Sequence, residues 1–185
     1  MTPARPTYTV KIAGLKRDLS LFEVAPGLRI AVLNILGDTE LVQACAKALV
    51  KKLASIDYDV LVTAEAKSIP LVYAMSVETG KKHIVLRKVY KPYMGAALSA
   101  ETHSITTGAP QMLFLDEKDQ DTLKGKKAVI LDDVISTGST LSGMRLLMER
   151  AGADVVAEAA IFTEGDDPGV WKHIISLGNL PLFKS

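Results

Sequence analysis

One short segment of the sequence gathers residue types that suit the binding of a phosphorylated sugar. Two adjacent carboxylates, Asp132 and Asp133, follow an apolar run, and small and hydroxyl residues occupy 136–140. Backbone N–H groups and hydroxyls at a helix N-terminus bind phosphate, and Gly138 lets the backbone approach closely. Carboxylates beside that site would repel further phosphates but accept hydrogen bonds from vicinal hydroxyls. A ribose 5-phosphate satisfies both requirements at once.

The full segment resembles a known ligand-binding signature. Val129-Ile-Leu-Asp-Asp-Val-Ile-Ser-Thr-Gly-Ser-Thr140 strongly resembles the phosphoribosyl-diphosphate (PRPP) signature of the type I phosphoribosyltransferases. A Walker loop is excluded because no GxxxxGK is present, and the loop has too few glycines for a dinucleotide fingerprint. The plain alternative is a strand–turn–helix corner with surface acids. The resemblance implies that Asp132 and Asp133 are catalytic residues that hold the ribose hydroxyls. It assigns the 5′-phosphate to Ser136, Thr137, Gly138, Ser139 and Thr140.

Two further segments resemble the parts of this family that bind diphosphate. Thr63-Ala-Glu-Ala-Lys-Ser-Ile69 is similar to the pyrophosphate-binding loop of the adenine enzymes. Lys67 stands where they usually carry arginine, which keeps the charge but loses bidentate geometry, and Ser68 stands where they carry glycine. Leu86-Arg-Lys-Val-Tyr-Lys-Pro92 is similar to their Arg-Lys-x-x-Lys-Pro-like segment. The diphosphate is thereby assigned to Glu65, Ala66, Lys67, Ser68, Arg87, Lys88 and Lys91, with Lys91 also predicted to be catalytic.

A long stretch with no clear period, residues 90–110, is similar to the mobile hood loop of the adenine enzymes. They usually carry a Leu-Glu-Tyr-Gly-like element near its end, where this chain reads Ser104-Ile-Thr-Thr-Gly108. Thr106 therefore takes the place of the acid. Asn34 and Phe162 are candidates for the base pocket, and a plain turn residue is an equally good interpretation of Asn34.

The elements that must position these residues alternate along the chain. Apolar runs predict strands over 8–12, 28–33, 59–63, 83–86, 111–115, 128–131 and 155–162. Helical spacing predicts helices from an N-cap at Asp38 to Leu53, over 68–79 and over 140–150. This alternation predicts an α/β fold: a mostly parallel twisted sheet with helices on both faces. Its ligand is expected beyond the carboxyl ends of the strands.

The predicted organisation is effectively one domain. Residues 1–35 form a small β-rich hood segment, and residues 36–185 form the PRPP-binding α/β core of the type I phosphoribosyltransferases, with a mobile loop at 90–110. The family builds its hood over the base from the regions that match its pattern least in this chain.

Composition limits the other classes of function. Among 185 residues, 22 Lys and Arg balance 21 Asp and Glu, a formal charge of +1, which weighs against a nucleic-acid interpretation of the basic run at 81–91. The single cysteine, Cys45, excludes an internal disulfide and a cysteine-based zinc site, and its helical spacing predicts a core position. No signal peptide is visible, and the longest charge-free stretch, 102–115, is too short to span a bilayer. A cytoplasmic location is expected.

The resemblance implies an enzyme of purine salvage, a pentosyltransferase that transfers ribose 5-phosphate from PRPP to a purine base and releases diphosphate. Adenine is the first expected acceptor, with xanthine, hypoxanthine or orotate as alternatives. Mg²⁺ is expected to bind with PRPP, through its oxygens and water, without protein side-chain ligands. The expected partners are PRPP and a nucleobase, with neither nucleic acid nor membrane, in a homodimer where Arg87 or its neighbours reach the partner's site. A PRPP-sensing regulator without turnover is the other alternative.

Overall fold

The computed structural model describes residues 5–103 and 110–184. Its helices are α1 (Thr39–Leu53), α2 (Ile69–Thr79), α3 (Glu117–Leu123) and α4 (Ser139–Arg150), with short 3₁₀ turns η1 (Pro92–Met94) and η2 (Pro168–Trp171). Its strands are β1 (Thr7–Ile12), β2 (Leu15–Ala25), β3 (Leu28–Val32), β4 (Val60–Ala64), β5 (Lys82–Leu86), β6 (Leu98–His103), β7 (Pro110–Leu115), β8 (Lys127–Ile135), β9 (Asp154–Glu164), β10 (Ile175–Leu180) and β11 (Phe183–Lys184).

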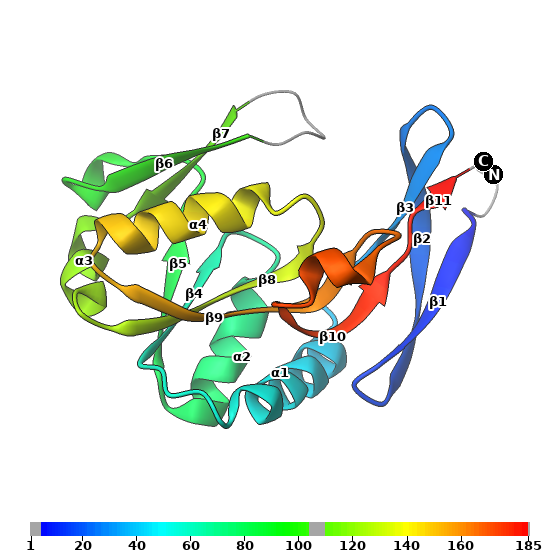
Figure 1. Ribbon diagram of the computed structural model, residues 1–185, viewed down its shortest axis with the longest axis horizontal. Coiled ribbons are helices and arrows are strands. Elements are labelled where there is room, and N and C mark those ends of the chain that lie inside the picture. The colour runs from blue at the N-terminus through cyan, green and yellow to red at the C-terminus, as the bar shows by residue number, and fades with distance from the viewer. Residues whose placement is uncertain (1–4, 104–109, 185) are drawn as a thin grey trace.

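A five-stranded parallel sheet forms the centre of the molecule, in the order β10-β9-β8-β4-β5. Helices α1 and α2 cover one face, and α4 covers the other (Figure 1). The strands are buried on both faces, so β4 is apolar almost throughout: Leu61 points into the core under α1 and α2, while Val60 and Val62 point toward α4. The predicted α/β class is confirmed.

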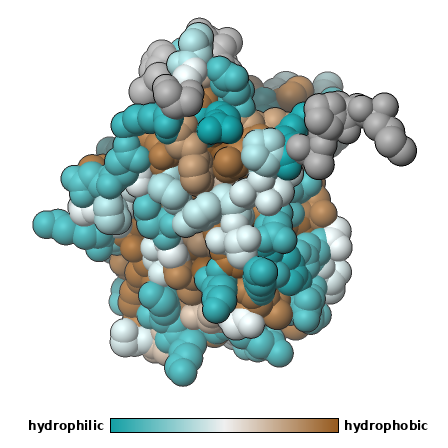
Figure 2. Space-filling model, turned by 90° about the vertical axis from the view of Figure 1, so that its right-hand side faces the viewer, coloured by the Kyte–Doolittle hydropathy of each residue, from teal (hydrophilic) through white to brown (hydrophobic). Residues whose placement is uncertain are grey.

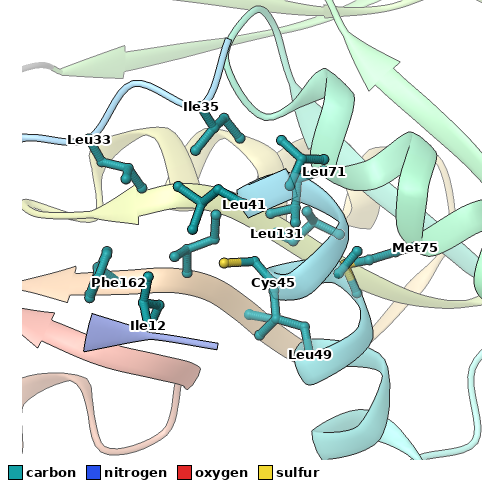
Figure 3. Close-up of a cluster of buried hydrophobic side chains, with 14 of the residues drawn as sticks. Ile12, Leu33, Ile35, Leu41, Cys45, Leu49, Leu71, Met75, Leu131 and Phe162 are labelled. Carbon is teal, nitrogen blue, oxygen red and sulfur yellow. The ribbon is translucent and has the colours of Figure 1, made fainter. Parts of the chain in front are cut away.

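The core between the sheet and helices α1 and α2 is tightly filled (Figure 3). Cys45 lies at its centre with no exposed surface, and burial raises the pKa of its thiol to about 12. The thiol therefore stays protonated at neutral pH and acts as a small hydrophobic side chain. This confirms the predicted core position of Cys45.

A second, antiparallel sheet in the order β1-β2-β3-β11 stands at one end of the parallel sheet, and we call it the hood sheet (Figure 1). The sheet is curled, so that side chains of its two edge strands come into contact. The rings of Tyr8 in β1 and Phe183 in β11 lie 5.1 Å apart. Arg17 of β2 joins it to the core through two hydrogen bonds to Asp38, at 2.7 and 3.0 Å. Asp38 also accepts from Leu41 N–H, which confirms it as the N-cap of α1.

Several elements were not predicted. The stretch expected to be an irregular loop contains β6, which pairs with β7 as a hairpin over α4. The buried residues of β6 are small because α4 approaches closely: a Cβ placed on Gly143 would lie 2.1 Å from Cγ2 of Thr102. This close approach explains the weak apolar signal of β6. Helix α3 and strands β10 and β11 were not predicted either. Whether the 90–110 segment is mobile stays a prediction.

None of the helices in the part of the chain that the structure describes has the length and apolar character to cross a bilayer. The view from the hood side shows hydrophilic and hydrophobic residues intermixed over that face (Figure 2).

Candidate active site

The residues predicted to do chemistry meet at the carboxyl ends of four neighbouring strands, β5, β4, β8 and β9. Side-chain hydrogen bonds join each segment to the next, in the pairs Arg87–Glu65, Ser68–Asp132 and Ser136–Glu164. Parallel strands end at the same edge of a sheet, so segments far apart in sequence become neighbours there. The predicted site residues are therefore brought together at one edge of the sheet.

Two adjacent carboxylates, Asp132 and Asp133, form the acid pair. They lie inside β8, because that strand continues to Ile135 and does not end before them as the sequence suggested. Ser68 Oγ donates to Oδ1 of Asp132 at 2.7 Å and accepts from the N–H of Asp133 at 2.8 Å. Lys67 Nζ lies 2.7 Å from Oδ2 of Asp133. Consecutive residues of the β4–α2 loop (65–68) therefore hold both acids.

Ser68, a predicted diphosphate residue, turns its side chain toward the acid pair, and its contact with diphosphate stays a prediction. Its side chain is 1% exposed and its hydroxyl points to the acid pair. Only the backbone of this residue is left to meet a diphosphate. The buried hydroxyl already has both a hydrogen-bond acceptor and a donor, so a further partner is not required.

Asp133 keeps an acceptor atom for a ligand. The contact with Lys67 is an ion pair by distance, but Oδ2 of Asp133 accepts no hydrogen bond of good geometry from any residue that the structure describes. A buried carboxylate oxygen in that condition is costly unless another donor reaches it. A sugar hydroxyl is a donor of the right kind.

The electrostatics of the acid pair are unusual for aspartate. Burial, together with the like charge of Asp133, raises the pKa of Asp132 to about 7. The hydrogen bond from Ser68 opposes this rise because it stabilises the carboxylate. The charge of the pair therefore changes near neutral pH, and so does its capacity to accept hydrogen bonds.

An anion-sized hollow lies next to the acid pair. It has a volume of about 170 Å³ and is lined by Asp132, residues 134–138 of the end of β8 and the β8–α4 loop, and residues 139–141 of α4. Gly138 caps α4 with φ +76°, and the first turn of α4 contains no acidic residue. Thr137 and Ser139 hydroxyls lie within 3.2 Å of each other beside it. Helix N–H groups, hydroxyls and a nearby glycine are the features that bind a phosphate.

One predicted phosphate ligand is engaged elsewhere. Ser136 Oγ donates to Oε1 of Glu164 at 2.6 Å. Glu164 is buried at the end of β9, so this bond ties the β8–α4 loop to the neighbouring strand. Ser136 lines the hollow, but its hydroxyl holds the loop in place.

The only tryptophan of the chain supports the same loop. Trp171, at the end of η2, packs against Gly138 so closely that a Cβ on this glycine would lie 2.7 Å from the ring atom Cη2. Position 138 thus requires glycine twice, for the left-handed backbone and for the contact with the indole.

Glu65 organises the basic segment that follows β5. Its Oε2 lies 2.6 Å from Arg87 Nε, and its Oε1 accepts from the N–H of Lys88 at 2.6 Å. This carboxylate raises the pKa of Arg87 above its ordinary value. Glu65 was predicted to contact the diphosphate, yet its two oxygens hold the segment that carries the cations. The exposed Lys88 and Lys91 have no ion pair among the described residues, and Ala66 is an exposed residue of the β4–α2 loop.

The two residues predicted for the base pocket differ in burial: Asn34 is exposed and Phe162 is buried. Asn34 is exposed, and its Oδ1 accepts from the N–H of Leu36, which is the turn role that was left open for it. Phe162 is 3% exposed and packs in the core, where a Cβ on Gly178 would lie 2.9 Å from its ring. Phe162 is therefore a core residue in this structure, and its place in the base pocket stays a prediction. Thr106 lies outside the described residues.

Sequence reasoning missed Glu164 and Trp171. Glu164 lies two residues beyond a predicted strand, in the region where ligand loops were expected, but its bond to Ser136 depends on strands β8 and β9 being neighbours. Trp171 follows Pro168-Gly169 in an irregular stretch, so no periodicity points to it.

The described residues contain no group of three or more His, Cys, Asp or Glu side chains placed to hold a metal ion. Any divalent ion at this site would take oxygen ligands from a bound diphosphate and water, which Mg²⁺ commonly does.

Comparisons with known proteins agree with this geometry. A model of the phosphoribosyl transferase domain matches residues 32–179. The hypoxanthine/guanine phosphoribosyltransferase of Methanococcus maripaludis (strain C7) is 38% identical over 121 residues, which cover 64% of this chain and 60% of that protein. The adenine phosphoribosyltransferase of Thermosipho africanus is 33% identical over 125 residues, which cover 66% and 69%. The chain thus spans about 60% of the length of the first of these relatives.

Solved structures share the fold. The adenine phosphoribosyltransferase of Thermoanaerobacter pseudethanolicus gives a TM-score of 0.65 at 21% identity, over 94% of this chain and 95% of that one. The enzyme from Trypanosoma brucei, solved with AMP, pyrophosphate and ribose-5-phosphate, gives 0.65 at 18% identity, over 82% and 70%. At these identities the likeness shows a common fold.

Proposed function

The chain belongs to the phosphoribosyl transferase domain family, and we propose that it transfers the ribose 5-phosphate group of PRPP to a purine base, releasing diphosphate. The observation that carries this proposal is the acid pair beside the 170 Å³ hollow at the N-terminus of α4. One site then offers acceptors for two sugar hydroxyls and donors for one phosphate.

Different residues would bind different parts of PRPP. Backbone N–H groups and hydroxyls of 137–140 bind the 5′-phosphate, while Asp132 and Asp133 accept hydrogen bonds from the ribose hydroxyls. Lys67, Arg87, Lys88 and Lys91 would bind the diphosphate and neutralise its charge as it leaves C1′. A base nitrogen then attacks from the opposite face of the ribose. Such a reaction depends on positioning and electrostatics, so the chain needs no nucleophile of its own.

We propose that Mg²⁺ accompanies PRPP. The ion supplies positive charge to the departing diphosphate, whose oxygens and bound water ligate it. The exposed lysines of the basic segment add to this charge without competing for the metal.

Two kinds of purine, adenine and the 6-oxopurines, are supported as acceptors by different observations. Similarity to the adenine phosphoribosyltransferase of Thermosipho africanus and the resemblance of residues 63–69 to the adenine enzymes favour adenine. The 38% identity to a hypoxanthine/guanine enzyme favours a 6-oxopurine. We place adenine first, with hypoxanthine and guanine as the direct competitors.

We also propose that two copies of the chain associate. Large apolar side chains are exposed on α2 and on the segment after β5, with Tyr73, Val77, Val89 and Tyr93 between 57% and 72% exposed. An apolar groove of about 340 Å³ runs between α1 and α2 beside them. Surfaces of this kind commonly become interfaces.

The test is diphosphate release from PRPP with Mg²⁺, against adenine, hypoxanthine, guanine, xanthine, uracil and orotate. Release with one purine supports the transferase and identifies the acceptor. Tight PRPP binding without release from any base contradicts turnover and points to a PRPP sensor. Absence of PRPP binding overturns the proposal, and sedimentation at several concentrations tests the dimer.

A further inference from the structure

Ser68 occupies a position where a serine normally has a different task. It is the N-cap of α2, where a serine side chain usually accepts a hydrogen bond from a backbone N–H of the first helical turn. Here the side chain makes no such bond. The backbone carbonyl of Ser68 accepts the ordinary first hydrogen bond of the helix, from Val72 N–H. The hydroxyl therefore contributes nothing to the capping of its own helix.

The hydroxyl instead lies between the two acids. It carries one proton, and the shortest contact, 2.7 Å to Oδ1 of Asp132, takes it, while Oδ1 of Asp133 lies 3.3 Å away. Its lone pair accepts the N–H of Asp133 at 2.8 Å. One buried atom thus fixes the carboxylate of one acid and the backbone of the other.

Ser68 also joins two parts of the site. It follows Lys67, whose ammonium meets Asp133, and it belongs to the loop that faces the diphosphate position. Any shift of the β4–α2 loop is therefore transmitted to the acid pair through two consecutive side chains.

We propose that Ser68 is a positioning residue for the phosphoribosyl transfer: its hydroxyl fixes the acid pair relative to the β4–α2 loop so that ribose and diphosphate are bound in register. This inference rests on the proposed function. It assigns the Ser68 side chain a role through Asp132 and Asp133 and no contact with PRPP.

The charge of the acid pair gives the inference a distinctive readout. The Ser68 hydrogen bond lowers the pKa of Asp132 against burial and Asp133, which raise it. Two charged groups lie beside the Asp132 carboxylate: Asp133 on the same strand, and Lys67, which is paired with Asp133. Removal of the hydroxyl raises the pKa of Asp132 further, so fewer molecules carry the ionised acid at neutral pH.

The test compares Ser68→Ala and Ser68→Cys with the wild-type chain and with Ser76→Ala. The cysteine keeps the side-chain volume but donates weakly, which separates packing from hydrogen bonding. Ser76 lies on the same helix and donates to the Lys81 carbonyl at 2.6 Å, away from the site, so Ser76→Ala controls for loss of a hydroxyl bond in α2.

The measurements are the Kd of PRPP with Mg²⁺ by calorimetry and the pH profile of kcat/KM for PRPP from pH 5.5 to 9.5. We expect both Ser68 variants to bind PRPP about fivefold more weakly at pH 7, with the acid limb of the profile moved upward by about one pH unit and the loss recovered at high pH. Ser76→Ala should follow the wild type throughout.

The outcomes are distinct for the two proposals. Profiles of folded Ser68 variants that coincide with the wild type would overturn the positioning role and leave the transferase intact. A loss that is equal at every pH would assign Ser68 to packing and also overturn it. A wild-type chain that neither binds nor consumes PRPP would refute the proposed function itself.

Discussion

Lys67 Nζ lies 2.7 Å from Oδ2 of Asp133, so a cation of the β4–α2 loop is paired with one of the two carboxylates of the acid pair. The Asp133 side chain is 7% exposed and that of Lys67 is 46% exposed. A buried carboxylate requires such compensation, whereas the half-exposed lysine can reach a ligand from the same position. The pair links the charge needed for diphosphate to the acid needed for ribose.

Replacement of this lysine is expected to affect both ligand binding and stability. Lys67→Met should weaken PRPP binding by about tenfold or more, since hydrogen bonds to charged groups contribute roughly 1.5–3 kcal/mol, and should lower the melting temperature because Asp133 loses its partner. Lys67→Arg should retain most of the binding. Lys47→Met, at an exposed contact of 3.9 Å with Glu78, is the matched control and should change neither quantity. An unchanged Kd in Lys67→Met would contradict the assignment.

Removal of the acid pair tests the ribose site directly. Asp132→Ala combined with Asp133→Ala should reduce kcat/KM far more than tenfold, since the hydroxyls of the ribose lose both acceptors. Steady-state kinetics with the best purine acceptor measure this loss. Circular dichroism shows whether the variant remains folded, and a folded variant that loses less than about tenfold would refute the assignment.

The stability of the protein should depend on pH through Asp132. Its pKa of about 7 in the folded chain exceeds the ordinary aspartate pKa of 3.8, so between these values the folded state binds more protons at this group than the unfolded state. The contribution of Asp132 to the free energy of unfolding therefore falls as pH rises from about 4 to 7 and stays constant above. Urea denaturation of wild type and Asp132→Asn should show their difference shrinking or reversing over that range; a difference independent of pH would exclude the raised pKa.

Substrate binding should have the opposite pH dependence. The ribose hydroxyls are donors, so they need the ionised carboxylate, and the affinity for PRPP should increase as pH rises through about 7. Calorimetric titrations in buffers of different ionisation enthalpy should also detect proton release on binding at pH 6.5. Proton uptake at that pH would be inconsistent with this role of Asp132.

Gly138→Ala should disrupt the hollow without removing any side-chain ligand. An alanine at φ +76° costs about 1–2 kcal/mol, and its Cβ would collide with the Trp171 ring. Both the melting temperature and the affinity for ribose 5-phosphate should fall. Gly80→Ala, at a similar φ of +68° with open space around it, controls for backbone strain alone. If the two variants lose ribose 5-phosphate binding equally, the contact with the indole is irrelevant.

The same contact makes Trp171 an internal reporter. Because the chain has one tryptophan and it packs on the β8–α4 loop, ribose 5-phosphate should change its fluorescence in a saturable manner. Ribose without phosphate should leave the emission unchanged. A phosphate-dependent signal that persists after Thr137→Ala and Thr140→Ala together would place the anion somewhere else.

The fold was predictable where burial is complete on both faces of a strand. The apolar run at 128–131 identifies a central strand, and the acids and hydroxyls that follow identify the ligand edge. The strand β6 escaped prediction because Thr102 and its neighbours are small enough to fit under α4 at Gly143. β10 escaped it because Gly178 makes room for the Phe162 ring.

The partners of the hydroxyls could not be predicted from sequence. Ser68 and Asp132 are 64 residues apart, and Ser136 and Glu164 are 28 apart. Their contacts depend on which strands are neighbours in the sheet, and the residue types alone are equally compatible with bonds to phosphate. For the same reason Glu65 was assigned to the diphosphate although its charge suits Arg87.

The pairing of β11 with β3 has a consequence for protein synthesis. Phe183 pairs with Arg29, so the hood sheet is completed by residues that leave the ribosome 154 positions after their partner. At about 5–20 residues per second, β3 waits roughly 8–30 s with an open edge. An open edge is a template for pairing with other chains. The nascent chain is therefore exposed to misassembly at β3 until β11 closes that edge.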